Sequence, residues 1–266
     1  MLLITSREYK LTLQHREFAA GASAVEAFWQ ELKALAETLE IAKTGTLDSL
    51  EERSIQFLDT PDSSVRNNGL LLRRRVEKDT KEFQYTLKCR SPDRYLAAAR
   101  DVRAVQAFDF KEKFEEDITT PFSSRFSHSA TVTVPAHGGA DIKFKTIGDA
   151  AKMFPVLGNL RRDGMRCPPE TTLLPVNSLE VRERVFSGGD LLLDAEKAEA
   201  ALIIWSIGQQ ERLVVAEFSF RYKNKQEDYS AGCACASMQL FQALQRVDWF
   251  EPAGATKTEF LYGDTA

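Results

Sequence analysis

Charged side chains in this 266-residue sequence recur at every second position of segments that otherwise resemble β-strands. Arg73 and Arg75 lie two apart in GLLLRRRVE, and Gln84, Thr86 and Lys88 follow the same spacing in FQYTLK. Side chains two apart on a strand share a face. Two arginines at that spacing can bind neighbouring phosphate oxygens in pairs, and a lysine adds a point charge. These segments are therefore suited to binding a polyphosphate.

Acidic side chains show the same spacing elsewhere. Glu115 and Asp117 lie two apart in FKEKFEEDI, and Glu8 shares the segment SREYKLTLQ with Lys10. Glu217 lies among apolar neighbours in RLVVAEFSFRY. Mg²⁺ and Mn²⁺ need only one or two carboxylates besides waters and phosphate oxygens. Such an ion can position a water for in-line attack on a phosphate, so the four carboxylates are candidate metal ligands.

Strands must carry most of these side chains. Alternation of polar and apolar residues predicts strands at 6–14, 69–76, 83–89, 110–118, 178–186, 190–194, 200–207 and 212–222. Helical spacing predicts amphipathic helices at 21–40 and 229–246. Residues 119–178, rich in Ser, Pro and Gly, are expected to elaborate a single domain spanning 1–266 with loops and small elements.

Charges on one face of each strand have two explanations. An antiparallel sheet with its polar face in water is the simpler one. The other is an α+β fold in which a closed antiparallel β-barrel of about eight strands forms a hydrophilic tunnel, with helices packed outside. A dry interior of this kind would be costly, but water, metal and a polyanion would make it tolerable. Like charges clustered at two-residue spacing favour the tunnel.

Composition narrows the class of protein. The net charge of −4 gives no support to non-specific nucleic-acid binding, and no apolar run is long enough to span a membrane. The opening MLLITSREYK reaches charged residues too early for a signal peptide. The few cysteines fit a reduced, cytoplasmic setting; they are Cys89, Cys167, Cys233 and Cys235. The scattered histidines (His15, His128 and His137) do not suggest a zinc site.

Four motifs in order, DTPD, NNGLLLRRR, FQYTLK and TKTEFLY, resemble the CYTH superfamily. This group, the triphosphate tunnel metalloenzymes, includes class IV adenylate cyclases, thiamine triphosphatases and inorganic triphosphatases. Its pattern is a D-T-P turn, an N-x-G-x-x-L-R-x-R strand, a T-L-K strand and a lysine-bearing C-terminal segment. The resemblance covers most of the chain outside 119–178 and implies a tunnel-shaped barrel that binds a triphosphate.

The resemblance also implies roles for individual residues. The phosphate-binding and catalytic positions are Lys10, Arg73, Arg75 and Lys88. Further substrate-binding candidates are Lys113, Arg182 or Arg184, which alternation does not separate, Arg221 and Lys257. The implied ligands of Mg²⁺ or Mn²⁺ are Glu8, Glu115, Asp117 and Glu217.

Two departures from the family pattern concern the metal. Ser6 and Ser219 stand where the family has carboxylates, so two potential ligands are lost. The remaining carboxylates suffice for one ion, whereas the departures put a second ion in doubt.

The sequence thus predicts a metal-dependent hydrolase of a triphosphate, either inorganic or carrying a small organic group. One alternative is a non-catalytic polyphosphate- or nucleotide-binding protein with a degenerate metal site. Another is a class IV-type adenylate cyclase, although no segment identifies an adenine pocket. The expected partner is the small triphosphate, with neither nucleic acid nor membrane, and a homodimer is left open.

Overall fold

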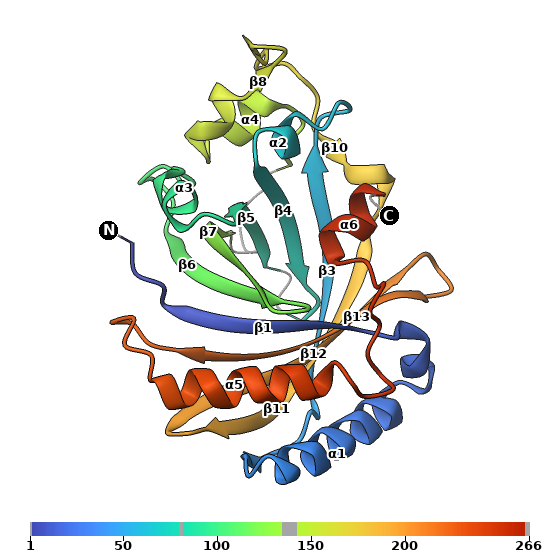
Figure 1. Ribbon diagram of the computed structural model, residues 1–266. Coiled ribbons are helices and arrows are strands. Elements are labelled where there is room, and N and C mark those ends of the chain that lie inside the picture. Colours follow the sequence, from blue (N-terminus) through green and yellow to red (C-terminus); the bar gives the residue numbers. More distant parts are fainter. Residues whose placement is uncertain (1, 80–81, 135–142, 264–266) are drawn as a thin grey trace. The chain divides into compact units, whose positions relative to one another are not determined.

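The computed structural model describes residues 2–79, 82–134 and 143–263; His137 lies outside the described residues. The strands are β1 (Ser6–Leu13), β2 (Ala42–Thr44), β3 (Ser49–Asp59), β4 (Leu70–Glu77), β5 (Phe83–Ser91), β6 (Phe110–Thr119), β7 (Ser123–Val134), β8 (Arg161–Arg162), β9 (Met165–Arg166), β10 (Leu174–Pro175), β11 (Val181–Leu193), β12 (Glu196–Ile207) and β13 (Arg212–Lys223). The α-helices are α1 (Ala22–Thr38), α2 (Ser64–Asn67), α3 (Arg94–Ala99), α4 (Ile147–Ala151), α5 (Ala231–Leu244) and α6 (Lys257–Tyr262). Short 3₁₀ helices are η1 (His15–Ala20), η2 (Pro155–Asn159) and η3 (Val176–Ser178). The expected α+β composition is confirmed (Figure 1).

One large sheet contains most of the strands. Its hydrogen-bonded order is β10-β3-β4-β5-β7-β6-β1-β13-β12-β11-β2, while β8 and β9 form a separate pair. Because β3 also pairs with β11, nine of the described strands form a ring of paired neighbours. This differs from the expected count of about eight. The closed barrel itself stays a prediction.

The sheet is not wholly antiparallel. β1 pairs with β6 in parallel, with Ser6 opposite Glu115 and Glu8 opposite Asp117. The two strands are far apart in the sequence, so no tight hairpin turn forces them to run in opposite directions. The expectation of an antiparallel arrangement therefore fails at this pair, although the side chains still alternate between faces as expected.

The chain divides into two compact units. Unit 1 contains residues 1–2, 53–114 and 126–181, and unit 2 contains residues 3–52, 115–125 and 182–266. Unit 1 has more Lys and Arg than Asp and Glu, so the acidic excess behind the net charge of −4 belongs to unit 2.

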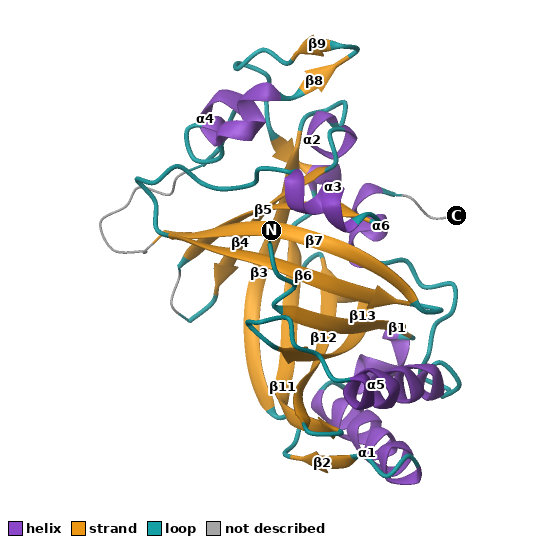
Figure 2. Cartoon of the chain, turned by 60° about the vertical axis from the view of Figure 1, so that its left-hand side comes forward, coloured by secondary structure: helices purple, strands orange, loops and turns teal. Residues whose placement is uncertain are grey.

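In unit 2, α1 and α5 pack against the same face of the strands (Figure 2). Helix α1 turns Val25, Phe28, Trp29 and Leu32 toward the sheet because residues three and four apart share one side of a helix. Helix α5 is capped by Ser230, whose hydroxyl oxygen accepts a hydrogen bond from the backbone N–H of Cys233. The predicted helices at 21–40 and 229–246 are thus confirmed.

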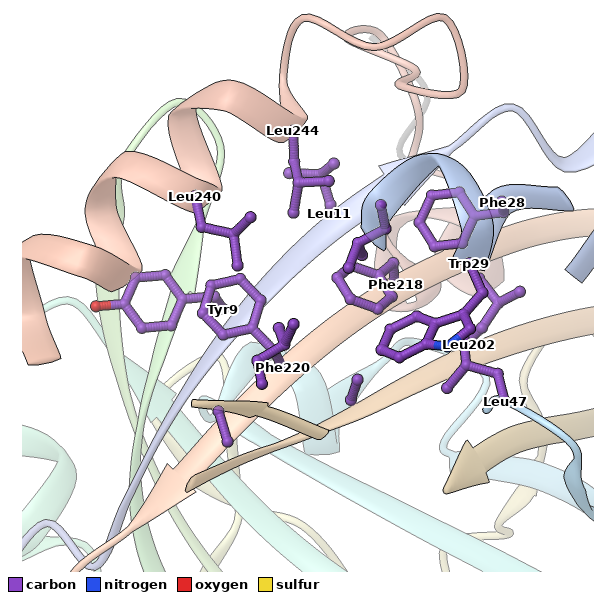
Figure 3. Packing of buried hydrophobic residues seen from close by; sticks show 14 of the residues in the cluster. Tyr9, Leu11, Phe28, Trp29, Leu47, Leu202, Phe218, Phe220, Leu240 and Leu244 are labelled. Carbon is purple, nitrogen blue, oxygen red and sulfur yellow. The ribbon is translucent and has the colours of Figure 1, made fainter. Parts of the chain in front are cut away.

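Aromatic residues fill the space between these helices and the strands (Figure 3). Tyr9 of β1 stacks on Phe220 of β13, with ring centroids 4.7 Å apart. Phe28 of α1 meets Phe218 edge-on at 5.2 Å. Since these rings occupy the helix-covered face of β1 and β13, the alternate residues lie on the opposite face, here called the polar face of unit 2.

Trp29 fixes how α1 meets β11. Its side chain is fully buried, and its Nε1 donates to the carbonyl of Gly45 at 3.1 Å. A Cβ at Gly189 of β11 would lie 2.5 Å from the indole ring, closer than atoms pack. Glycine at this position is therefore required by the close approach of the indole.

In unit 1, β4, β5 and β7 bury one face against a second apolar cluster. Leu72, Tyr85 and Val132 from the strands pack with Phe144 and Phe154 from the segments that follow β7. The alternate residues of the same strands form the polar face of unit 1.

Residues 119–178 differ in part from the expected loops. Ser123–Val134 is a full strand, β7, paired with β5 from Phe83 opposite Val134 to Ser91 opposite Phe126. Its run of Ser and Thr resembles a loop composition, but Ser127, Ser129, Thr131 and Thr133 alternate with the buried Ala130 and Val132 and lie on the polar face, where the Thr86 and Thr131 hydroxyls pair across strands. Small elements follow it, as expected.

One other prediction differs from the structure. The expected strands at 178–186 and 190–194 are one strand, β11. The tail TKTEFLY, for which no helix or strand was predicted, includes the helix α6. No described helix is both long and apolar enough to cross a membrane.

Candidate functional site

The polar face of unit 1 carries the predicted phosphate-binding arginines. Arg73 and Arg75 of β4 lie opposite Thr86 and Gln84 of β5. A guanidinium nitrogen of Arg73 donates to Thr86 Oγ1 at 3.4 Å, and one of Arg75 donates to Gln84 Oε1 at 3.5 Å. These long hydrogen bonds orient both guanidinium groups along the same face.

Lys88 continues this face along β5. It lies opposite Leu71, one step beyond the Arg73–Thr86 pair, and opposite Ser129 of β7. The structure therefore brings Arg73, Arg75 and Lys88 onto one face, as the spacing predicts.

Arg74 lies on the other face of β4. Its guanidinium lies 4.9 Å from the centre of the Phe83 ring, and it donates to Gln56 at 3.4 Å. This separation makes Arg74 a natural control for the neighbouring arginines.

The polar face of unit 2 holds a lysine between two carboxylates. Glu8 of β1 lies opposite Asp117 of β6 and Arg221 of β13. Lys10 Nζ lies 3.0 Å from Glu8 and 2.8 Å from Asp117. The Asp117 side chain is 1% exposed, against 17% for Lys10 and 18% for Glu8. This triad is largely shielded from water, so its charges depend on one another.

The electrostatics of the triad follow from that shielding. Burial alone would raise the pKa of Glu8, but attraction to Lys10 and Arg221 outweighs it and the pKa is lowered. Burial would likewise lower the pKa of Arg221, but the negative charges of Glu8 and Glu199 raise it. Both side chains are therefore held in their charged forms.

Glu115 lies next to the triad on β6 and is engaged by a serine. Ser6 Oγ donates to Glu115 Oε1 at 3.0 Å, and both side chains are buried. The serine that replaces an expected carboxylate thus serves as a hydrogen-bond donor to a neighbouring one. Ser219, the other replacement, is buried opposite Lys10.

Glu217 forms an ion pair with the C-terminal helix. Lys257 Nζ lies 2.8 Å from Glu217 Oε1 and 5.6 Å from the centre of the Trp205 ring. Lys257 is the first residue of α6, whose start is fixed by a capping box between Thr256 and Glu259. The predicted tail lysine therefore reaches a predicted metal ligand.

A buried pair on the same face was not among the residues that the sequence indicated. Trp205 Nε1 donates to Glu183 Oε2 at 2.8 Å, and Glu183 is 3% exposed. On β12, Leu202 and Ile204 face the helices. Trp205 directly follows Ile204, so its side chain lies on the opposite, polar face of the strand. No such signal marks Glu183, because it alternates with two arginines in VRERV.

The structure does not place Arg182 and Arg184, the two arginine candidates of β11, beside the predicted metal-binding carboxylates. Arg182 pairs with Glu52 at 2.7 Å and with Glu211, and it is 40% exposed. Arg184 shares its side, opposite that of Glu183. The alternation in the sequence separates the two sides of β11 but does not show which side continues the polar face. The buried Trp205–Glu183 pair shows that this is the side of Glu183.

The remaining basic candidates, Arg221 and Lys113, belong to different units. Arg221 donates to Glu199 at 3.0 Å on the polar face of unit 2. Lys113 is half-buried on β6 and lies in unit 1.

The predicted carboxylate ligands have the donor atoms that a hard divalent cation prefers, but their arrangement fits such an ion less well. They offer only oxygen, the donor that Mg²⁺ and Mn²⁺ take. Among the described residues, however, no group of three or more Asp, Glu, His or Cys side chains is arranged to hold a metal ion. Glu8 and Asp117, which share Lys10, are the pair that most resembles a ligand set.

Comparison with known proteins identifies the fold. No family model and no curated protein matches the sequence. HpAC1 from Hippeastrum, an adenylyl cyclase candidate described as having a dominant triphosphatase activity, shares 11% identity, with a TM-score of 0.50 over 99% of this chain and 97% of that one.

An adenylate cyclase candidate from Bacillus halodurans shares 12% identity, with a TM-score of 0.41 over 97% of this chain and 96% of that one. At 11% identity the likeness to HpAC1 extends to the fold and not to individual site residues. The fold shared with HpAC1 agrees with the resemblance to the CYTH superfamily that the sequence motifs indicate.

Proposed function

We propose that the protein is a metal-dependent hydrolase of a linear triphosphate, inorganic or with a small organic group. The observation that carries this proposal is the shared face of Arg73, Arg75 and Lys88. Two guanidinium groups on one face can each bind phosphate oxygens in pairs, and Lys88 adds a further charge. The strands would enclose a barrel with these groups inside it.

The polar face of unit 2 would supply the metal. Glu8 and Asp117 would hold Mg²⁺ or Mn²⁺ together with waters and phosphate oxygens, and the ion would neutralise charge on the transferred phosphate. Lys10 lies within 3.0 Å of both carboxylates, so its positive charge offsets theirs while no cation is bound. The proposed setting is the cytoplasm, in keeping with four free cysteines.

Release of phosphate from tripolyphosphate with Mg²⁺ or Mn²⁺ tests this function. Arg73→Ala and Lys88→Ala should each lower the rate by ~100-fold, because each removes a charge-assisted contact to the reacting anion. Arg74→Ala, on the opposite face, should keep the rate. Equal rates in all four proteins would refute the assignment.

A second candidate is a protein that binds the triphosphate without cleaving it. The observation in its favour is that Lys10, Ser6 and Lys257 already engage the four predicted metal ligands. Tight binding of tripolyphosphate with no phosphate release across metals would support it. Cyclic AMP formed from ATP would instead identify an adenylate cyclase.

A further inference from the structure

The polar face of unit 1 continues beyond Lys88 to a residue that no motif identified. Arg90 is the next residue of β5 on that face and lies opposite Ser127 of β7. Its Nε donates to Ser127 Oγ at 3.3 Å. Ser127 is fully buried and Arg90 is half-buried, so the arginine stem is held against the sheet.

The face of Arg90 follows from its neighbours. Leu87 and Cys89 are buried in the apolar cluster on the other side of β5. Thr86 and Lys88, which alternate with them, pair with Thr131 and Ser129 of β7 on the polar face. Arg90 therefore shares its face with Lys88 and, across β4, with Arg73 and Arg75.

The basic row is longer than the motifs alone suggest. Facing residues of β4 and β5 follow one another along this row: Arg75 faces Gln84, Arg73 faces Thr86 and Leu71 faces Lys88. Arg90 comes two residues after Lys88. Each step of two residues spans roughly 6.8 Å, so the backbone positions of the first and last cations lie roughly 20 Å apart. A single pyrophosphate cannot bridge that length.

The chemistry along this row suits phosphate better than a nucleobase. On the described strands β5 and β7, the polar-face positions beside the row are Gln84, Thr86, Ser127, Ser129, Thr131 and Thr133. Hydroxyls and amides can donate to phosphate oxygens, whereas none of these side chains offers an aromatic surface for a base to stack on. At the far end an organic group would meet the cation Arg90.

We infer that Arg90 is a specificity residue that binds the distal phosphates of the substrate, so the site favours linear inorganic phosphate chains over nucleotides. This inference rests on the proposed function. Arg90 can bind two phosphate oxygens through its planar fork, while Ser127 holds its Nε in place. Longer chains gain this contact, and pyrophosphate bound at Arg73 and Arg75 does not.

Calorimetric binding without metal tests the inference, since it needs no turnover. Pyrophosphate, tetrapolyphosphate and ATP would be titrated into the wild type and the Arg90→Ala, Arg90→Lys, Arg73→Ala and Arg74→Ala variants. Arg90→Ala should weaken tetrapolyphosphate binding by ~10-fold, the loss of one charged hydrogen-bonding group, and leave pyrophosphate and ATP within about twofold. Arg90→Lys, which keeps the charge, should recover part of the loss.

The outcomes distinguish a failure of the Arg90 inference from a failure of the proposed function. If Arg90→Ala weakens all three ligands equally, or none of them, the inference is wrong. If Arg73→Ala also changes no affinity, the proposed function fails with it. If Arg73→Ala weakens every ligand while Arg90→Ala has no effect, only the role of Arg90 fails. Should Arg90→Ala not fold, Arg90→Gln makes the same comparison.

Discussion

Replacing Lys10 with methionine is expected to destabilise the protein strongly at neutral pH. Lys10 Nζ lies 3.0 Å from Glu8 and 2.8 Å from Asp117, whose side chain is 1% exposed. At an effective dielectric of about 20, attraction at the shorter distance amounts to roughly 6 kcal/mol before desolvation is subtracted. Removing one partner of a buried ion pair costs about 3–5 kcal/mol, because the carboxylates keep their charge without their cation.

The loss should depend on pH in a defined direction. The pKa of Glu8 is lowered in the folded protein, against the effect of burial, largely by Lys10. A carboxyl with a lowered pKa stabilises the fold above its unfolded pKa of about 4.3, and this stability disappears as the pH falls through the folded value. The difference between wild type and Lys10→Met should therefore be largest near pH 7 and shrink below about pH 4.

Urea unfolding of both proteins from pH 7 to pH 3 measures this difference. Lys197→Met is the control, because Lys197 forms a comparable 2.8 Å ion pair with Asp190 but is 67% exposed, and it should unfold like the wild type. Mn²⁺ should stabilise Lys10→Met more than wild type, since a bound cation replaces the missing charge. A loss below about 1 kcal/mol at pH 7, or a loss that is the same at pH 3, would refute the reasoning.

The remaining predictions concern stability at three other places and are measured by urea unfolding. Gly189→Ala should cost about 1–3 kcal/mol, because its Cβ would lie 2.5 Å from the buried Trp29 ring; Trp29→Phe in the same background should recover part of the loss. Asp59→Ala should cost about 1–3 kcal/mol, because the Asp59 carboxylate accepts hydrogen bonds from the backbone N–H groups of Val65 and Arg66 at the start of α2, whereas Asp59→Asn should cost less. Trp205→Phe should cost about 1–3 kcal/mol, because Glu183 loses a donor, and loss of this effect in a Glu183→Met background, which has no carboxylate acceptor, would confirm the pairing.

Alternation of side chains was enough to predict the faces of most strands. It separated Arg73 and Arg75 from Arg74, because a two-residue period is a property of a single strand. The helices at 21–40 and 229–246 were predictable for the same reason, since their apolar stripes depend on local spacing alone.

Properties that depend on partners across the sheet were not predictable. Nothing within SREYKLTLQ indicates that β1 runs parallel to β6 or that Lys10 lies between Glu8 and Asp117. Similarly, VRERV does not show that Glu183, and not Arg182, lies beside Trp205. Such facts depend on register and on which face of a strand is covered, and both are set by residues distant in the sequence.

A crystal soaked with tripolyphosphate and Mn²⁺ tests the central claim most directly. We expect phosphate oxygens within hydrogen-bonding distance of Arg73 and Lys88, together with an anomalous manganese peak at Glu8 and Asp117. An anion bound away from β4 and β5, or a manganese peak away from β1 and β6, would contradict it.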